Sequence, residues 1–489
     1  MELTQLLNSV KVIQVIGEVQ RQDISGIYYD SRKVIKNSVF VAVKGYKTDG
    51  HNYILDAINK GAIAIILEDN SRVPDDIFTH GKIAKILVNN SRIALAEFSN
   101  AFFKEPSQKL KLIGITGTNG KTTTSYFIKK ILETSGKKVG LVGTISNFIG
   151  SLEINSSLTT PEANDLNALL LEMYNDGCTY AVMEVSSHSL SLNRVYGLNF
   201  SAGVFTNITS DHLDFHETFE NYLNAKKILF ESLTQSAFGI YNIDDANCNV
   251  LIKDSKAQLF SYGALPNADF ILKDINFDLN GTSFSILYNN KNYSVTTSLI
   301  GEFNAYNACA AFAVCVLLGI NEDEAIEGIK NTIQVPGIFE VIGNGNKKIV
   351  IDYSHTADSL EKALLAIKKI VKDELPIYTV FGCGGNRDKS KRPIMGKIAS
   401  ELSKQAIITS DNPRFENPFV IIDEIKKGIE KNNCIVIENR EEAIKFAVEN
   451  SEDNAVILIA GKGHENYQEI NGIRNHFSDK EVAEKYLNI

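Results

Sequence analysis

A glycine-rich segment at residues 114–124 restricts the possible folds of this chain more than any other feature. It reads Gly-Ile-Thr-Gly-Thr-Asn-Gly-Lys-Thr-Thr-Thr, follows an apolar strand-like run and leads into a helical pattern. In a strand, glycine turn and helix of this kind, the backbone N–H groups around Gly117 and Gly120 surround phosphate oxygens. Lys121 adds a positive charge, and the Thr122 hydroxyl can ligate magnesium. The segment predicts an ATP or GTP site; the alternative is a glycine turn without a ligand.

Length and composition favour a cytoplasmic protein of several domains. A chain of 489 residues, 44% of them hydrophobic, exceeds the roughly 250 to 300 residues at which one core stops growing. The longest apolar stretch, residues 309–320, is shorter than the about 18 residues of a membrane span, and the first residues carry no basic segment. A formal charge of −9 argues against nucleic acid as the main partner. Six scattered cysteines indicate neither disulfides nor a zinc site.

Strand-like and helical segments alternate along the chain, which is typical of α/β proteins with parallel sheets. Proline-containing breaks suggest three domains, at residues 1–108, 109–335 and 336–489. We expect a parallel sheet of P-loop NTPase type with flanking helices in the second domain and a Rossmann-like α/β fold in the third. The carboxyl ends of strands line the ligand crevice in such sheets, so polar clusters that follow strands are candidate site residues.

Two polar clusters follow strand-like runs of the central domain. Glu184 ends an apolar run, where an acid is costly unless a cation or a metal compensates it. Its alternative role is that of a salt-bridged glutamate at a strand end. Asp211 and His212 end the next run, where they either bind magnesium or its water shell or belong to a solvated turn.

Lys226 lies at the centre of an apolar stripe on the helix expected over residues 219–233. A lysine that points toward the interior is uncommon, so we expect its amine to be paired, neutralised or chemically converted. The alternative is an amine that snorkels to solvent.

Polar side chains elsewhere suggest a nucleotide base and a small zwitterion as ligands. Asn304 and Asn307 precede an apolar helix, where they either contact a base or cap the helix. Four clusters follow strands of the last domain and contain Arg387, Arg414 and Glu465. Guanidinium groups suit carboxylates and a glutamate can hold an ammonium group, so the clusters fit an amino acid.

Taken together and in this order, these residues resemble the Mur ligase family, the ATP-dependent amino-acid ligases of peptidoglycan precursor synthesis. The resemblance covers essentially the whole chain. Four strings are similar to those of the member that acts on UDP-N-acetylmuramoyl-L-alanyl-D-glutamate: Tyr-Asp-Ser-Arg at 29–32, Gly-Tyr-Lys-Thr-Asp-Gly at 45–50, Leu-Thr-Thr-Pro at 158–161 and Glu-Val-Ser-Ser-His at 184–188. The string Asp-Asn-Pro-Arg at 411–414 is similar to that of members adding meso-2,6-diaminopimelate, in which the arginine meets a carboxylate that L-lysine lacks.

The resemblance implies a role for each candidate residue. ATP would be bound by Gly117, Thr118, Asn119, Gly120, Lys121, Thr122, Thr123 and Asn304. The UDP-substrate would be bound by Tyr29, Ser31, Tyr46, Lys47, Thr48, Thr159, Thr160, Ser186 and Arg194. Within this set, Ser31 and residues 46–48 would hold the uridine end, and the last four residues would contact the muramoyl dipeptide. Diaminopimelate would be bound by Arg387, Asp411, Asn412, Pro413, Arg414, Gly461 and Glu465. Magnesium would be held by Thr122, Glu184, His212 and Lys226, the last as N6-carboxylysine, and the catalytic set would be Lys121, Lys226, Glu184 and His212.

The implied reaction joins meso-diaminopimelate to the D-glutamate side-chain carboxylate through an acyl phosphate, with ATP and Mg²⁺ as cofactors. The first domain would be a smaller α/β domain for the uridine nucleotide, and the protein would be a cytoplasmic monomer with small-molecule substrates. The same reaction with L-lysine, a folylpolyglutamate synthase-like ligase and an ATP-dependent switch without a product are the alternatives.

The chain departs from the family pattern at four positions. Ile338 stands where the family usually has arginine, which puts a phosphate or hinge contact in doubt. Ala357 replaces a proline, Asn386 replaces a common aspartate, and Leu192 stands where some relatives have glutamine. None of these changes removes an expected metal ligand or a residue of the phosphate loop.

Overall fold

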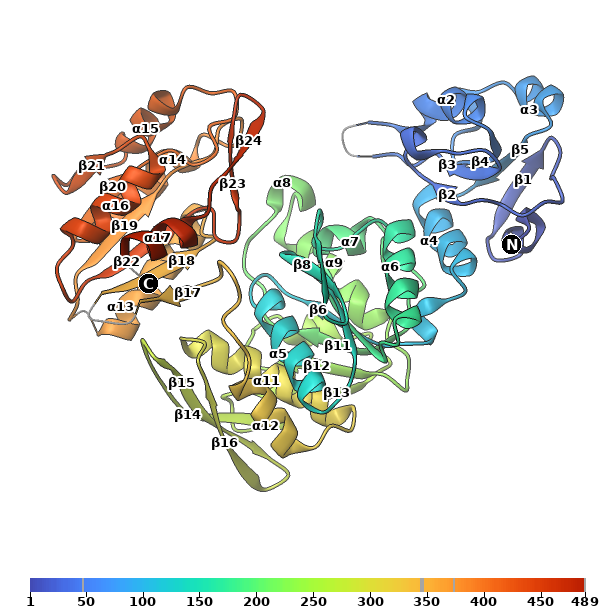
Figure 1. Ribbon diagram of the computed structural model, residues 1–489. Coiled ribbons are helices and arrows are strands. Elements are labelled where there is room, and N and C mark those ends of the chain that lie inside the picture. Colours follow the sequence, from blue (N-terminus) through green and yellow to red (C-terminus); the bar gives the residue numbers. More distant parts are fainter. Residues whose placement is uncertain (46–47, 344–346, 373, 488–489) are drawn as a thin grey trace. The chain divides into compact units, whose positions relative to one another are not determined.

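The computed structural model describes residues 1–45, 48–343, 347–372 and 374–487 (Figure 1). The chain divides into two compact units. The first comprises Met1–Leu272, Ile286–Asn292 and Tyr306–Ile329, and the second comprises Lys273–Ser285, Tyr293–Ala305 and the described residues from Lys330 onward. Each unit is built from sheets flanked by helices, so the predicted α/β class is confirmed.

The amino-terminal part of the first unit is a five-stranded sheet with helices. Its elements are α1 (Leu3–Leu7), β1 (Val12–Ile16), β2 (Ile27–Tyr28), β3 (Ser38–Val41), α2 (Ile54–Asn59), β4 (Ala62–Leu67), α3 (Asp75–Gly81), β5 (Ala84–Val88) and α4 (Ser91–Phe102). The strand order is β1-β5-β4-β3-β2, and all neighbours pair in parallel except β1 and β5.

A second sheet contains eleven strands. They are β6 (Lys111–Thr116), β7 (Val139–Val142), β8 (Ser146–Ile149), β9 (Leu152–Asn155), β10 (Tyr180–Glu184), β11 (Phe200–Phe205), β12 (Phe238–Asn242), β13 (Gln258–Gly263), β14 (Phe270–Asp278), β15 (Gly281–Tyr288) and β16 (Lys291–Thr297). The order is β16-β15-β14-β13-β12-β11-β6-β10-β7-β8-β9, and the strands from β12 to β7 in this order are mutually parallel.

The helices that lie between strands of this sheet along the chain are α5 (Lys121–Thr134), α6 (Ala163–Asn175), α7 (Ser187–Ser191), α8 (Leu213–His216), α9 (Phe219–Glu231) and α10 (Cys248–Ile252). The helices α11 (Glu302–Leu317) and α12 (Glu322–Lys330) come after its last strand. The strand β11 ends at Phe205, so Asn207 lies outside it. Asn207 instead turns toward the glycine-rich loop, where its Oδ1 accepts the Asn119 N–H at 3.0 Å.

The carboxyl-terminal part of the second unit is a six-stranded sheet with a separate hairpin. The strands are β17 (Glu340–Ile342), β18 (Lys348–Asp352), β19 (Ile377–Phe381), β20 (Gln405–Ile408), β21 (Cys434–Val436), β22 (Val456–Ala460), β23 (Tyr467–Ile470) and β24 (Ile473–His476). The helices are α13 (Ala357–Val371), α14 (Lys391–Leu402), α15 (Pro418–Lys426), α16 (Arg440–Asn450) and α17 (Asp479–Leu487). The order is β17-β18-β22-β19-β20-β21, and only β17 pairs antiparallel.

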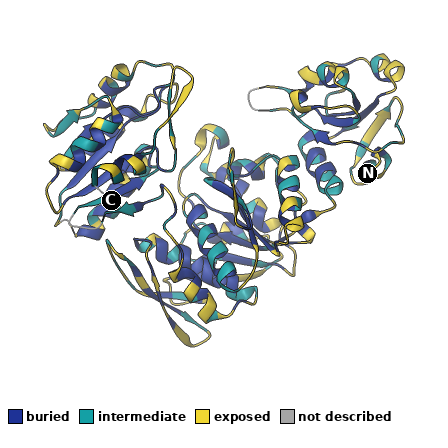
Figure 2. Ribbon diagram, in the orientation of Figure 1, coloured by how far each residue is buried: buried dark blue, intermediate teal, exposed yellow. Residues whose placement is uncertain are grey.

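Alternate residues of this last sheet enter two different hydrophobic cores. Leu458 of β22 packs in one cluster with residues of α13 and α14, whereas its neighbours Ile457 and Ile459 pack in another with residues of α16. Successive side chains of a strand point to opposite faces, so helices cover both faces of the sheet. Figure 2 accordingly shows the strands buried and the outer faces of the helices exposed.

The parallel registers bring the ends of several strands to one edge of each sheet. Glu184 at the end of β10 pairs with Ile115 of β6, and Phe205 at the end of β11 pairs with Thr116. In the last sheet, Ala460 pairs with both Asp352 and Phe381. The predicted polar clusters after these strands therefore gather at the strand ends, as in other open α/β sheets.

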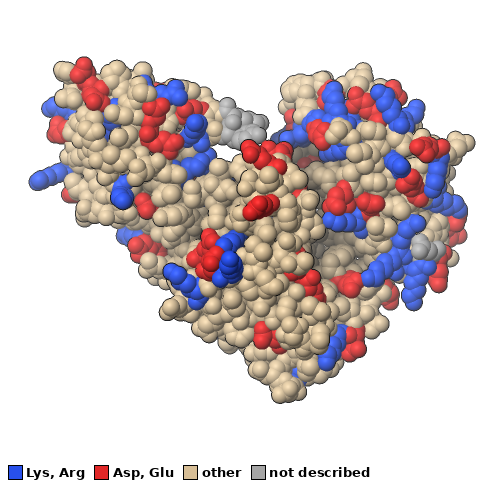
Figure 3. Space-filling model, turned by 180° about the vertical axis from the view of Figure 1, so that it is seen from behind, with Lys and Arg blue, Asp and Glu red and all other residues tan. Residues whose placement is uncertain are grey.

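The predicted boundaries at 108/109 and 335/336 lie between the three main sheets, and we keep them as a proposal. On the face drawn in Figure 3, acidic and basic side chains lie intermingled. Among the described helices, none is long and apolar enough to cross a membrane.

Candidate active site

The loop after β6 has the backbone geometry expected of a phosphate loop. Gly117 has φ 152° and Gly120 has φ 86°, so both adopt conformations that L side chains rarely take. A Cβ atom at Gly117 would lie 1.9 Å from the Thr206 Oγ1 atom, so only glycine fits there. The loop is also tied to the end of β11, because the Thr118 N–H donates to the Asn207 carbonyl at 2.8 Å.

Two lysine side chains meet at this loop. The Lys121 Nζ donates to the carbonyls of Gly117 and Thr118, both at 2.9 Å, and the Lys226 Nζ donates to the same Gly117 carbonyl at 2.7 Å. Lys226 lies on α9 and is only 1% exposed, so its amine does not snorkel to solvent. The glycine turn and the Lys226 amine therefore meet at the Gly117 carbonyl.

Burial determines the protonation of both lysines. Desolvation lowers the pKa of Lys226 well below its usual value, and the nearby charge of Lys121 lowers it further. Desolvation also lowers the pKa of Lys121, although Glu184 and Asp211 oppose this shift. The Lys226 side chain is thus biased toward a neutral amine, the form that reacts as a nucleophile.

Glu184 accepts three hydrogen bonds at the end of β10, where its side chain is fully buried. The Thr122 Oγ1 atom donates to Oε2 at 2.9 Å, while Thr144 donates its N–H to Oε1 at 2.9 Å and its hydroxyl to Oε2 at 3.0 Å. Burial raises the pKa of Glu184, and the positive charge of Lys121 opposes the rise. Thr144 is not among the residues predicted from the sequence, although it lies in the loop that follows β7, as other candidate residues follow other strands.

His212 lies in a cluster of aromatic rings beside the phosphate loop. Its ring centroid is 4.8 Å from that of His188, and its Nε2 atom is 3.5 Å from the Asp211 carboxylate. Burial lowers the pKa of His212, which leaves the imidazole neutral and able to ligate a metal.

The predicted metal ligands have the donor chemistry that magnesium requires. Thr122 and Glu184 lie in direct contact and provide the oxygen ligands that magnesium prefers. Among the described residues, no group of three or more histidine, cysteine or acidic side chains could hold a metal ion. A carboxylated Lys226 would add further oxygen atoms to this set, so the residues fit magnesium with that modification.

The buried ring of His216 should make the stability of the protein depend on pH. Its ring is buried against the Ser187 hydroxyl at 2.9 Å, and burial lowers its pKa from 6.5 to about 4. The unfolded chain therefore binds a proton before the folded chain does, and the free energy of unfolding should fall as the pH drops from about 6.5 to about 4. His216→Gln keeps a polar group near Ser187 but cannot take up this proton. Its Tm should therefore fall less between pH 6.5 and pH 4 than the Tm of the wild type does, by about 2 °C or more in a thermal melt. Melts at pH 8, where His216 is neutral in both states, are the reference, and an unchanged pH slope would contradict the assignment.

Four residues predicted to bind the muramoyl dipeptide lie together next to Glu184. The Thr160 hydroxyl donates to the Glu184 carbonyl at 2.8 Å and accepts the Ser186 N–H at 3.2 Å. The Thr159 hydroxyl lies 3.1 Å from that of Thr144, and Arg194 Nη1 donates to the Thr160 carbonyl at 3.1 Å. The structure thus brings this predicted set together beside the carboxylate of β10.

The other residues predicted to bind the UDP-substrate are not gathered in the same way. Tyr29 donates its hydroxyl to Asp165 on α6. Ser31 is buried, and its carbonyl accepts from Lys60. Thr48 is exposed and contacts the hydroxyl of Tyr53 at 3.2 Å. Tyr46 and Lys47 lie outside the described residues.

Asn304 and Asn307 lie within the first turns of α11, not before the helix as predicted, because the helix already begins at Glu302. The two side chains have different surroundings. Asn304 is buried, and its amide donates to the Ile300 carbonyl at 3.0 Å, so its predicted contact with adenine stays a prediction. Asn307 belongs to the first unit, and a Cβ atom at Gly120 would lie 2.4 Å from its Oδ1 atom. Asn307 therefore lies against the phosphate loop. This contact could not be predicted from the sequence, because Asn307 and the loop are far apart along the chain.

The predicted amino-acid residues of the second unit lie on loops at the ends of β20 and β22. The Asn412 amide donates to the Glu465 carboxylate at 2.9 Å. A Cβ atom at Gly461, which has φ 116°, would lie 2.7 Å from Asp411 Oδ2, so the carboxylate approaches this backbone closely. These four residues are brought together.

Arg414 is held at the edge of this group. Its Nη1 donates to the Gly385 carbonyl at 2.8 Å, and its Nε lies 3.9 Å from Glu469 on β23. A Cβ atom at Gly385 would lie 1.9 Å from the Pro413 carbonyl, so the two loops pack closely. Arg387 lies on the same loop as Gly385 and is exposed.

Asn386 joins these two loops, which explains how the chain accommodates this departure from the family pattern. Its φ is 53°, a left-handed conformation that asparagine and aspartate tolerate better than most residues. Its Oδ1 accepts the Phe415 N–H at 3.1 Å, and its own N–H donates to Glu416. Glu416 is held by the buried guanidinium of Arg392, which lowers the pKa of that carboxyl to about 2.

Replacing Asn386 should disturb amino-acid use more than ATP use. Asn386→Ala removes the acceptor of the Phe415 N–H and disfavours the positive φ, so we expect KM for the amino acid to rise about fivefold. Asn386→Asp keeps an acceptor in the same place and is the matched control, with a change below about twofold. Steady-state phosphate release measures both constants. Equal behaviour of the two variants would contradict the proposed contact.

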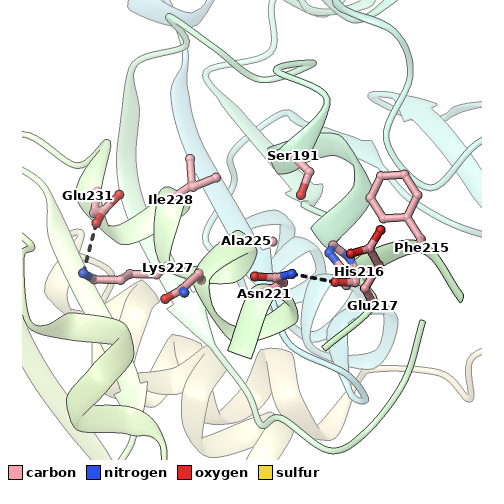
Figure 4. Close-up of a pocket in the computed structure, with 10 residues that line it drawn as sticks. Ser191, Phe215, His216, Glu217, Asn221, Ala225, Lys227, Ile228 and Glu231 are labelled. Atoms are coloured by element: carbon pink, nitrogen blue, oxygen red, sulfur yellow. Dashed lines mark hydrogen bonds and ion pairs between the residues drawn. The ribbon is translucent and has the colours of Figure 1, made fainter. Parts of the chain in front are cut away.

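A separate hollow lies between α7, α8 and α9. It has a volume of about 670 Å³, and Figure 4 shows Asn221 donating to the His216 carbonyl at 3.0 Å and Lys227 paired with Glu231 at 3.1 Å. None of its lining residues belongs to the predicted site.

Three family models match successive parts of the chain: "Mur ligase family, catalytic domain" at residues 23–103, "Mur ligase middle domain" at 115–315 and "Mur ligase, glutamate ligase domain" at 339–463. A UDP-N-acetylmuramoyl-L-alanyl-D-glutamate–2,6-diaminopimelate ligase of Clostridium acetobutylicum is 44% identical over 100% of this chain and 99% of that protein. The chain belongs to the Mur ligase family. The family resemblance noted in the sequence is thereby confirmed.

Two further Mur ligases show how far this likeness extends. The ligase of the same name from Clostridium botulinum is 43% identical, with 96% of each chain covered. A solved structure of a UDP-N-acetylmuramoyl-L-alanyl-D-glutamate–2,6-diaminopimelate ligase is 31% identical, covers 97% of each chain and has a TM-score of 0.70. The Mur ligase fold thus extends over nearly the full chain.

Proposed function

We propose that this chain is an ATP-dependent ligase that joins meso-2,6-diaminopimelate to UDP-N-acetylmuramoyl-L-alanyl-D-glutamate in peptidoglycan precursor synthesis. The relatives that share its full length carry that name at 42 to 44% identity. The observation that carries the proposal is the meeting of Lys226, Lys121 and the Gly117 carbonyl at one phosphate loop. This arrangement provides a triphosphate site beside the buried carboxylate of Glu184.

The proposed reaction has two steps. The γ-phosphoryl group of ATP passes to the D-glutamate side-chain carboxylate, which gives an acyl phosphate and ADP. An amine of diaminopimelate then attacks the acyl carbon, loses a proton and displaces phosphate, so that an amide remains. Lys121 would stabilise the negative charge of the transferring group, and most of the rate enhancement would come from positioning and preorganised charge.

Lys226 is proposed to act after conversion to N6-carboxylysine. Its buried amine, whose pKa desolvation lowers, would attack carbon dioxide in its neutral form, lose a proton and become an anionic carbamate. Magnesium bound by Thr122, Glu184, His212 and this carbamate would neutralise charge on the triphosphate. The hydroxyl groups of Thr122 and Thr144 hold the Glu184 carboxylate in place for this task.

Recognition of diaminopimelate is assigned to the second unit. Arg414 would pair with the distal carboxylate, Glu465 would hold an ammonium group, and Asn412 would support Glu465 through its amide N–H. The Arg414 guanidinium is already oriented by the Gly385 carbonyl, which reduces the entropy lost on binding. L-Lysine has no distal carboxylate, so this arginine favours diaminopimelate.

The remaining assignments concern the rest of the substrate and the protein as a whole. Thr159, Thr160, Ser186 and Arg194 would contact the muramoyl dipeptide beside Glu184. The uridine end would meet the amino-terminal domain, and the protein would act as a cytoplasmic monomer.

A product assay tests the proposed function. The protein is incubated with ATP, magnesium and UDP-N-acetylmuramoyl-L-alanyl-D-glutamate, with either diaminopimelate or L-lysine, and the products are weighed by mass spectrometry. We expect phosphate release and a new amide product with diaminopimelate only. A product with L-lysine alone would show that the amino-acid substrate is L-lysine and not diaminopimelate. Phosphate release without any amino acid would favour a switch, and use of a folate substrate would favour a folylpolyglutamate synthase-like ligase.

A further inference from the structure

A fully buried lysine follows β22 and contacts two residues of the proposed amino-acid site. Lys462 has a side-chain exposure of 0%. Its Nζ donates to Glu465 Oε2 at 3.2 Å, to Asn412 Oδ1 at 3.4 Å and to the Tyr467 carbonyl. The three protons of the ammonium group therefore all have acceptors, and it also lies over the Tyr467 ring at 5.3 Å. A buried charge with this complete set of partners fixes the atoms around it.

Lys462 determines which way the Asn412 amide points. The Oδ1 atom of Asn412 accepts from Lys462 and from the Glu469 N–H, the latter at 2.9 Å. With its oxygen held by two donors, the amide must direct its Nδ2 atom elsewhere, and that atom donates to Glu465 at 2.9 Å. Without Lys462, the Asn412 oxygen would keep only one of its two donors, and the amide could rotate more freely.

Lys462 also compensates the charge of Glu465. The Glu465 side chain is only 18% exposed, so an uncompensated carboxylate there would be costly. Both donors, Lys462 Nζ and Asn412 Nδ2, bind the same Oε2 atom and belong to the same network. The network thus holds one oxygen of the carboxylate and fixes the direction of the other.

We propose that Lys462 is a positioning residue for amino-acid recognition. It does not contact the substrate; it holds Glu465, directly and through Asn412, in the orientation that binds the substrate ammonium group. This inference rests on the proposed function, because it assumes that Glu465 binds the amino acid.

The test compares Lys462→Met with the wild-type enzyme in steady-state phosphate release. Methionine is close in length to lysine but carries no charge, so it removes the network without changing much volume. We expect KM for diaminopimelate to rise at least about tenfold, while KM for ATP stays within about twofold. Lys85→Met is the matched control. Lys85 is an equally buried lysine of β5 with its amine satisfied by Asn70, Val73 and Asp75, and its replacement should leave both constants unchanged.

A double-mutant cycle with Glu465→Gln separates positioning from direct contact. If Lys462 acts through Glu465, the double variant should have a KM for diaminopimelate within about twofold of the worse single variant. An unchanged KM in Lys462→Met, or effects that multiply in the double variant, would overturn the proposal. If Lys462→Met does not fold, Lys462→Gln, which keeps a donor but removes the charge, is held to the same criterion.

The same experiment distinguishes this inference from the function on which it rests. Wild-type enzyme that releases phosphate only with diaminopimelate supports the function, whatever Lys462→Met does. Wild-type enzyme without amino-acid-dependent phosphate release overturns both.

Discussion

Lys226→Ala should lower kcat by about 10²- to 10³-fold or more, the loss typical when a preorganised group that stabilises the transition state is removed. The alanine variant has no amine to carboxylate and so loses the proposed anionic ligand at the phosphate loop. It also removes the hydrogen bond of 2.7 Å to the Gly117 carbonyl. The measurement is the rate of phosphate release with saturating ATP, magnesium and both other substrates.

The adjacent lysine is a matched control for this variant. Lys227 lies on the same helix, but its amine pairs with Glu231 and Asp254, away from the phosphate loop. We expect Lys227→Ala to keep kcat within about twofold, because surface ion pairs contribute little to stability. A Lys226→Ala enzyme with normal rates would refute the role assigned to Lys226. Partial recovery of the alanine variant by added short-chain carboxylates would support a carbamate as the missing group.

Arg414→Ala should weaken the use of diaminopimelate far more than the use of ATP. Truncating one partner of a desolvated charge pair costs about 2 to 5 kcal/mol, so KM for diaminopimelate should rise about 30-fold or more. The Arg414 side chain is 21% exposed, and Gly385 holds it in one orientation, so its pairing with a carboxylate would be largely desolvated. Steady-state kinetics with each substrate varied in turn give the two KM values.

The controls for Arg414 use a second arginine and a second amino acid. Arg474 on β24 also lies near Glu469, at 3.6 Å, but is 64% exposed, and Arg474→Ala should change KM for diaminopimelate by less than about threefold. Any residual activity with L-lysine should be unaffected by Arg414→Ala, because that substrate lacks the distal carboxylate. Equal damage to ATP and diaminopimelate use would contradict the assignment of Arg414.

Local sequence patterns were sufficient for the elements that carry the site. The glycine turn after β6, the acid at the end of β10 and the lysine on the apolar stripe of α9 are each visible in a short window of sequence. Backbone conformation and burial in such segments depend mainly on nearby residues, through positive φ at glycine, strand alternation and helical periodicity. Glu184 and Lys226 are accordingly buried as expected.

Other expectations could not be reached from local patterns. Asn207, two residues after the end of β11, contacts the phosphate loop only because β11 and β6 are neighbours in the sheet. Thr144 was missed because only the parallel pairing of β7 with β10 brings it to Glu184. The hydrogen bond from the Phe415 N–H to Asn386 joins residues 29 positions apart.

The amino-acid sequence by itself determined the fold class, the phosphate loop and the family to which this chain belongs, because these depend on residue types at short spacing. Only the tertiary structure decided which donor meets which acceptor. It selected Thr122 and Thr144 for Glu184, the Gly117 carbonyl for Lys226, and Asn412 with Glu465 for Lys462. A hydrogen bond requires two atoms within about 3 Å, and that proximity arises when parallel strands bring distant loops to one edge of a sheet.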